Sequence, residues 1–195
     1  MRPSLILLAG PNGAGKSTLY ETRVAPSFAA PFINADAIQR DELKDVSLVA
    51  SYKAAEIAAA RRSEMLAEGR SFATETVFSH PSKLDIIEEA RQRGYVVIVM
   101  HVGVDSPDLS VARVKERVCE GGHDVPEDKV RARFDRGGPL IREAVLLADR
   151  GMVFDNSRLN QPPRQVLVFA KGRLTQAAPR LPDWVLSIYA DDLVI

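Results

Sequence analysis

The sequence predicts an α/β fold in which a mainly parallel, five-stranded sheet lies between helices in three layers. Two observations carry this prediction. Short apolar runs alternate with segments of helical periodicity along almost the whole chain, and a glycine-rich loop joins the first apolar run to a helix. Strands that alternate with helices usually pair in parallel. We expect the 195 residues to form a single domain.

The first apolar run, Ser4–Ala9, has the composition of a strand that is buried on both faces of a sheet. The nine residues that follow match G-x-x-x-x-G-K-[ST], the P-loop motif. Its glycines let backbone N–H groups turn toward phosphate oxygens. We therefore expect a nucleoside triphosphate and Mg²⁺, with Lys16 on the β- and γ-phosphates and Ser17 on the metal. The nucleotide-binding residues are Gly10, Pro11, Asn12, Gly13, Ala14, Gly15, Lys16, Ser17 and Thr18.

The later elements follow from residue preferences and stop signals. Further strands are predicted over residues 31–34, 71–75, 95–104, 152–154 and 165–170. Helices are predicted over residues 17–23, 36–38, 46–69, 81–93, 106–120, 125–149 and 184–190. We expect Gly137–Pro139 to interrupt the helix that begins near Val125, and Asp36 is a plausible N-cap.

Polar residues follow three of the predicted strands and should gather at the P-loop edge of the sheet. Asp36 is the candidate general base, with a role as N-cap only as the alternative. Glu75 could orient the substrate hydroxyl or bind magnesium through water, or be a solvated strand end. Asn156 could contact the adenine or the ribose, although Asp155-Asn156-Ser157 is also a common turn sequence.

A basic cluster over about residues 106–136 predicts a helical lid. Arg113 and Arg117 share one helix face, Gly121-Gly122-His123 follows as a hinge, and further arginines come after it. The guanidinium fork suits phosphate binding and offsets charge in the transition state. The alternative is a solvated face with i,i+4 ion pairs. The later arginines are Arg131, Arg133 and Arg136.

Composition excludes several classes of protein. The formal net charge is zero, and the pI is about 6.8. This balance argues against a general nucleic-acid or anionic-membrane binder, which would carry a basic surplus. One cysteine, Cys119, excludes an internal disulfide framework, and no apolar run near the start is long enough for a signal peptide or a membrane span. We expect a cytoplasmic protein.

With these pieces in order, the chain resembles the zeta-toxin-like P-loop kinases over about residues 4–157. The most specific matching element comes after the P-loop. It is Gly-Gly-His-x-Val-Pro-Glu, followed by Arg-x-Arg-Phe. The other matching segments are Ile33-Asn34-Ala35-Asp36, Thr74-Glu75-Thr76, residues 113–118 and Asp155-Asn156-Ser157.

The resemblance implies a kinase that transfers the γ-phosphate of ATP, with Mg²⁺, to a hydroxyl of a UDP-activated sugar such as UDP-N-acetylglucosamine. It also implies an antitoxin as a protein partner. On this basis the catalytic residues are Lys16, Asp36, Arg117 and Arg133. The expected substrate contacts are Asn34, Glu75, Thr76, His123 and Arg131.

Two other functions stay open from the residues alone. A P-loop kinase of another small metabolite or nucleoside would share the same loop, base and lid. A nucleotide-dependent switch or binding module is less consistent with the sequence, because it contains no Asn-Lys-x-Asp motif and His101 follows the apolar run Val97–Met100, where motor ATPases have an acid.

Overall fold

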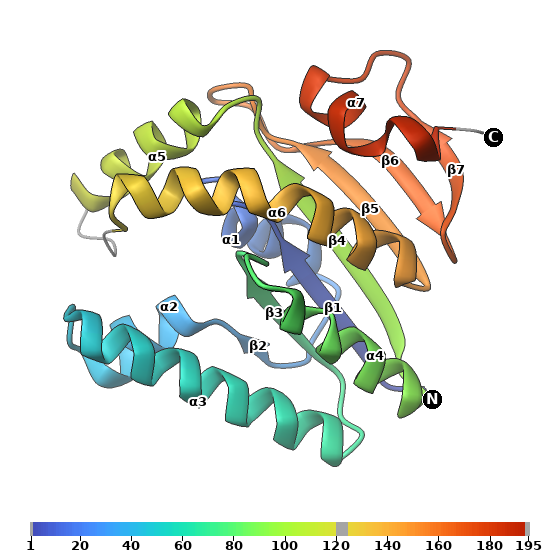
Figure 1. Ribbon diagram of the computed structural model, residues 1–195. Helices are drawn as coiled ribbons and strands as arrows, with labels where there is room; N and C mark the ends of the chain where they lie inside the picture. The colour runs from blue at the N-terminus through green and yellow to red at the C-terminus, as the bar shows by residue number, and fades with distance from the viewer. Residues whose placement is uncertain (1, 120–124, 194–195) are drawn as a thin grey trace.

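The computed structural model describes residues 2–119 and 125–193. In this part of the chain, seven strands form one sheet in the order β2-β3-β1-β4-β5-β6-β7 (Figure 1). The strands are β1 (Ser4–Ala9), β2 (Phe32–Ile33), β3 (Phe72–Thr76), β4 (Val96–Gly103), β5 (Arg150–Asp155), β6 (Arg164–Ala170) and β7 (Arg173–Ala177).

Helices connect most of these strands. The α-helices are α1 (Lys16–Leu19), α2 (Ala35–Ala37), α3 (Leu48–Ala67), α4 (Asp85–Gln92), α5 (Pro107–Cys119), α6 (Glu127–Leu147) and α7 (Asp183–Tyr189). Shorter π- and 3₁₀-helical segments are η1 (Tyr20–Val24), η2 (Ile38–Leu43), η3 (Pro81–Lys83) and η4 (Ala190–Asp192). In the described residues no helix combines the length and the apolar composition that crossing a membrane requires.

Strand β1 lies at the centre of the parallel part of the sheet, between β3 and β4. After β1, the chain forms β2 and β3 on one side of this strand. It then crosses over and forms β4 on the other side. Its carboxyl end is therefore a topological switch point, where open α/β sheets bind their ligands. The P-loop follows β1 at this point.

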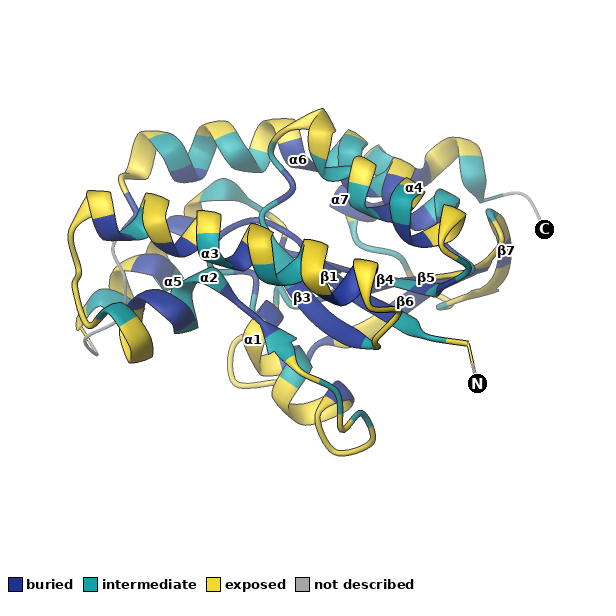
Figure 2. Ribbon diagram, turned by 90° about the horizontal axis from the view of Figure 1, so that it is seen from below, coloured by how far each residue is buried: buried dark blue, intermediate teal, exposed yellow. Residues whose placement is uncertain are grey.

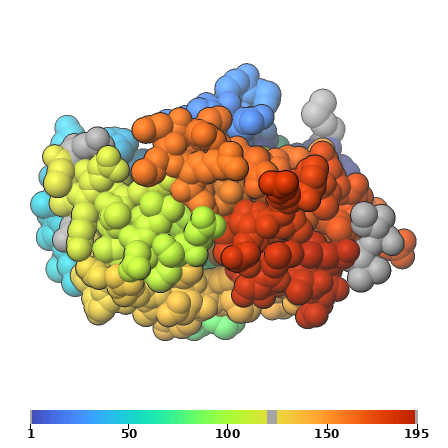
Figure 3. Space-filling view, turned by 90° about the horizontal axis from the view of Figure 1, so that it is seen from above, coloured from blue at the N-terminus to red at the C-terminus, as the bar shows by residue number. Residues whose placement is uncertain are grey.

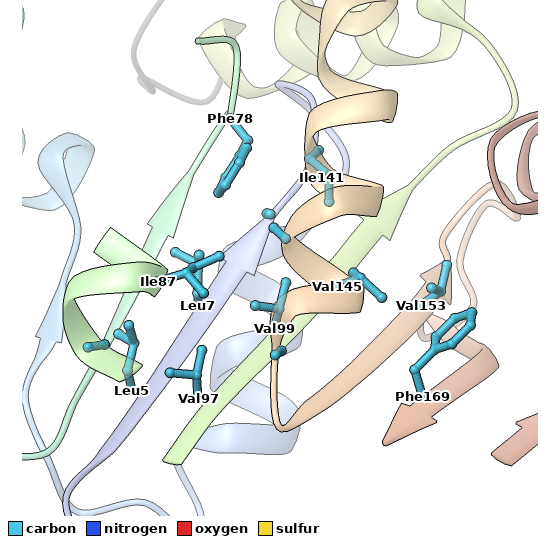
Figure 4. Close-up of a cluster of buried hydrophobic side chains, with 14 of the residues drawn as sticks. Leu5, Leu7, Phe78, Ile87, Val97, Val99, Ile141, Val145, Val153 and Phe169 are labelled. Carbon is cyan, nitrogen blue, oxygen red and sulfur yellow. The ribbon is translucent and has the colours of Figure 1, made fainter. Parts of the chain in front are cut away.

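Helices cover both faces of the sheet, so the arrangement has three layers. Leu5 and Leu7 of β1 pack into a core beneath α3, α4, α6 and α7 (Figure 4). Ile6 and Leu8, which alternate with them, pack against α1 and η1 on the opposite face. The central strands are consequently buried, while the edge strand β7 and the outer faces of the helices are exposed (Figure 2).

The prediction of a mainly parallel sheet is confirmed, but the number of strands was wrong. Five strands, β1 to β5, pair in parallel, and β6 and β7 add an antiparallel hairpin at the edge. The sequence did not predict β7 because this strand has no apolar run; Leu174 is its one buried residue. Its turn uses two residues with positive φ, Lys171 at 50° and Gly172 at 76°, and lysine is not a usual residue for such a turn.

The predicted interruption of α6 was also wrong, since the helix runs unbroken from Glu127 to Leu147 through Pro139. Packing explains why the sequence signal fails. A Cβ on Gly138 would lie 2.8 Å from Ile188 Cδ1 of α7. Gly137 is buried beside the backbone carbonyls of Val77 and Phe78. Gly138 therefore lets a continuous helix approach α7 closely.

The continuity of α6 predicts unequal responses at its two glycines. Gly137→Ala should raise the free energy of unfolding by about 0.5–1 kcal/mol, because alanine favours a helix interior. The new Cβ would have only ordinary contacts, with Ile141 Cδ1 at 3.6 Å. Gly138→Ala should gain less, since Ile188 must move. Urea denaturation followed by circular dichroism measures both, and a loss of stability in Gly137→Ala would contradict a continuous helix.

Candidate active site

The P-loop turns between β1 and α1 through backbone conformations that require glycine. Gly13 and Gly15 have φ angles of 72° and 86°, in the left-handed region that L side chains rarely adopt. A Cβ on Gly13 would also lie 2.6 Å from the carbonyl oxygen of Ser110 in α5. The motif therefore adopts the conformation predicted for it, with α5 packed directly against the loop.

Lys16 begins α1 and is 6% exposed. Its Nζ donates a hydrogen bond to the carbonyl oxygen of Pro11 at 3.1 Å, which folds the side chain back over the loop. Burial lowers the pKa of this lysine, and nearby charges adjust it in both directions: two carboxylates favour the charged form, and two guanidinium groups oppose it. These groups are Glu75, Asp36, Arg117 and Arg133. The structure thus brings all four beside the P-loop.

Asp36 lies in α2, directly after β2. We expected it as a plausible N-cap, but Asn34 caps this helix instead. Asn34 Oδ1 accepts hydrogen bonds from the N–H groups of Asp36 and Ala37 at 2.8 and 3.2 Å. The Asp36 carboxylate is therefore available for other contacts; its Oδ2 lies 3.8 Å from Arg117 Nη1, and its side chain is 46% exposed.

Ser17 and Glu75 form the second polar pair. Ser17 Oγ donates to Glu75 Oε2 at 2.8 Å, across from the P-loop to the end of β3. A hydroxyl and a carboxylate are the hard oxygen ligands that Mg²⁺ prefers, so these two residues fit a magnesium ion beside the phosphates. The neighbouring Thr76 accepts a hydrogen bond from the N–H of Phe78 at 3.2 Å and shapes the turn after β3.

The lid arginines divide into two groups. Arg133 reaches from α6 to the P-loop and donates to Asn12 Oδ1 at 3.3 Å. Arg131 points elsewhere: its guanidinium binds Asp108 Oδ1 at 2.7 Å and Glu127 Oε1 at 2.8 Å, which ties α6 to α5. Arg131 does not line the cavity, so the structure does not bring this predicted substrate contact into the site. His123 lies outside the described residues.

Asn156 lines the cavity, and it also contacts the P-loop, which the sequence did not predict. Its Nδ2 donates to the carbonyl oxygen of Ala14 at 2.8 Å, and its own carbonyl accepts from Arg113 Nη1 at 2.7 Å. The side chain thus supports the P-loop backbone, whereas we expected contact with adenine or ribose. The sequence analysis missed Arg113 in this role; its only signal was the shared helix face with Arg117. In Figure 3, α5 lies between α6 and the loop after β5.

These elements surround one cavity of about 710 Å³. Seven cationic side chains and three carboxylates line it, although the chain as a whole has no net charge. This surplus of positive charge suits anionic ligands. The cations are Lys16, Arg62, Lys83, Arg113, Arg117, Lys129 and Arg133, and the acids are Asp36, Glu75 and Glu116.

Comparison with known proteins assigns the family. The model of the zeta toxin family matches residues 1–160 of the chain. This chain belongs to the zeta toxin family. The family match extends over the P-loop, β2, β3 and both helices of the predicted lid. A Haemophilus influenzae protein described only as uncharacterized is 28% identical, and the match covers 69% of this chain and 94% of that protein.

Solved structures share the fold of this zeta toxin family member. The PezAT chromosomal toxin–antitoxin system of Streptococcus pneumoniae matches with a TM-score of 0.62 at 17% identity, over 80% of this chain and 68% of that chain. The AvrRxo1-ORF1:AvrRxo1-ORF2 structure with ATP matches with a TM-score of 0.67 at 14% identity, over 89% and 60%. These likenesses confirm the predicted P-loop fold.

The contact between Asn156 and the P-loop predicts a selective loss of nucleotide affinity. Asn156→Ala leaves the Ala14 carbonyl without its donor, so the affinity for a non-hydrolysable ATP analogue should fall about tenfold. Gln161→Ala is the matched control, because it removes an exposed amide from the same loop at a residue that does not line the cavity. Titration calorimetry measures both variants. Equal affinities would exclude the supporting role.

Proposed function

We propose that this protein is an ATP-dependent phosphotransferase that transfers the γ-phosphoryl group to a hydroxyl of a UDP-activated sugar such as UDP-N-acetylglucosamine. The position of Asp36 carries the proposal. Its carboxylate lines the cavity, lies 3.8 Å from Arg117 Nη1 and favours the charged form of Lys16. A carboxylate in this place suits a general base beside the phosphate site.

Each group has a role in the proposed transfer. The P-loop N–H groups and Lys16 hold the phosphates, and Ser17 with Glu75 would hold Mg²⁺, which supplies charge neutralisation when it is bound. Asp36 accepts the proton of the attacking hydroxyl while the oxygen of that hydroxyl bonds to the γ-phosphorus. The bond from that phosphorus to the bridging oxygen breaks, and the charge that passes to the diphosphate is offset by Lys16, Arg117 and Arg133.

The acceptor class rests on the motifs that resemble the zeta-toxin-like kinases, at residues 33–36 and 74–76. The cavity supports it in size, since about 710 Å³ is within the range of small-molecule sites. The chain would act as one P-loop kinase domain, with its lid over about residues 106–136. A structural neighbour named as a toxin–antitoxin system supports an antitoxin as the protein partner.

The proposal is tested by incubating the purified protein with ATP and Mg²⁺ and a panel of UDP-sugars, free sugars, gluconate, shikimate and nucleosides. Mass spectrometry identifies the phosphorylated product, with Lys16→Ala as the inactive control. Phosphorylation of a UDP-sugar supports the proposal. Phosphorylation of another metabolite alone would replace it with the alternative kinase function, and ATP hydrolysis without any product would exclude both.

Replacing Asp36 by asparagine should separate catalysis from folding. Asp36→Asn should lower kcat about 10²- to 10⁴-fold while ATP still binds, because the amide cannot accept a proton. The fold should persist, since Asn34 caps α2. Asp41→Asn removes an exposed carboxylate that pairs only with Arg40 at the surface, and it serves as the control. If Asp36→Asn keeps most of its activity, Glu75 becomes the candidate base.

Two arginines that are two residues apart on α6 give a matched pair for the lid. Arg133→Ala should lower kcat about 10³-fold with a smaller effect on ATP affinity, because a charge aimed at the transferring group acts mainly in the transition state. Arg131→Ala removes only ion pairs on the exposed side and should keep kcat close to the wild-type value. Steady-state kinetics with the best acceptor measures both, and the reverse order would contradict the assignment.

A further inference from the structure

Two cationic side chains line the cavity apart from the P-loop. Arg62 lies on α3, and Lys83 ends η3, the short helix after β3. Both side chains are partly buried. Burial lowers the pKa of each, and the charge of Arg62 lowers the pKa of Lys83 further. Two like charges therefore line the same cavity.

No carboxylate balances this pair. Among residues 2–119 and 125–193, neither the Arg62 guanidinium nor the Lys83 ammonium group forms an ion pair or a hydrogen bond with another residue. The adjacent Arg61, in contrast, has a carboxylate partner. Its guanidinium binds both carboxylate oxygens of Glu42 at 2.6 Å on the outer side of α3. Partly desolvated like charges without a counter-ion are unfavourable for folding, so the fold itself gives no reason for this pair.

The pair is separate from the phosphate site around Lys16. Lys16 lies at the start of α1, whereas Arg62 lines the cavity from α3 and Lys83 from η3. Helix α3 lines the cavity from Leu48 to Arg62, a span of about 21 Å at about 1.5 Å per residue. The cavity thus has room for an acceptor that reaches beyond the transferred phosphate.

We propose that Arg62 and Lys83 form a second anion-binding subsite, which binds a phosphate or diphosphate group of the acceptor. This inference rests on the proposed kinase function and specifies the acceptor as a phosphorylated compound. Arginine binds two phosphate oxygens at once, and lysine adds a point charge. The subsite would hold the acceptor by its anionic end while its hydroxyl lies at Asp36.

The test is titration calorimetry on the full-length protein, saturated with a non-hydrolysable ATP analogue and Mg²⁺ so that the P-loop is filled. The probes are UDP, glucose 1-phosphate and, as a carboxylate, gluconate. Wild-type protein should bind at least one of the two phosphorylated probes, and Arg62→Gln and Lys83→Gln should each weaken that binding about tenfold to hundredfold. Arg61→Gln is the matched control, one residue away, and should bind as wild type does.

A second measurement separates a ligand subsite from a structural role. Arg62→Gln and Lys83→Gln should unfold at the same or a higher urea concentration than wild type, since each removes an uncompensated charge. Asp36→Asn should keep probe binding while it loses turnover, so the subsite and the proposed reaction fail independently. Absence of binding by both phosphorylated probes, or binding that is equal in wild type, Arg62→Gln and Lys83→Gln, would overturn the proposal.

Discussion

The buried ammonium group of Lys16 is the constraint on which the site depends. A charge removed from water is costly unless nearby groups offset it, and one hydrogen bond to Pro11 does not suffice. The register of the parallel sheet supplies the rest: Thr76 of β3 pairs with Ala9 of β1, which brings Glu75 to the P-loop. The carboxylates that the proposed chemistry needs are therefore also the ones that stabilise the charged form of the buried lysine.

The shape of the P-loop depends in turn on residues far away in the sequence. Asn156, which follows β5, binds the Ala14 carbonyl with its side chain. The guanidinium of Arg113 in α5 binds the backbone carbonyl of Asn156. Arg133 of α6 binds Asn12 on the same loop. The phosphate site is consequently held from several directions, and movement of α5 or α6 would change the contacts around it. The helices that we predict to form the lid therefore contact the P-loop and the loop after β5 directly.

Local signals in the sequence predicted the P-loop, the parallel strands and the polar residues at their ends. Signals that depend on packing failed. Gly137–Pro139 predicted an interruption, but α6 stays continuous, and Gly138 lies where α6 packs closely against Ile188 of α7. Arg131 and Arg133 look equivalent in the sequence, yet two residues rotate a helix by about 200°. Only the packing of α6 decides that Arg133 faces the P-loop and Arg131 faces Asp108.

Arg61 and Arg62 are adjacent on α3, and the rotation of about 100° between them separates a paired arginine from one that lines the cavity. The outward arginine is paired with Glu42, while the inward one faces Lys83 in the cavity. Because the chain has no net charge but its cavity has a cationic surplus, the remaining surface carries the acidic excess. Unbalanced cations inside a cavity reduce the stability of the empty protein, and anionic ligands restore it when they bind. Ligand affinity and folding stability should therefore depend on the same side chains.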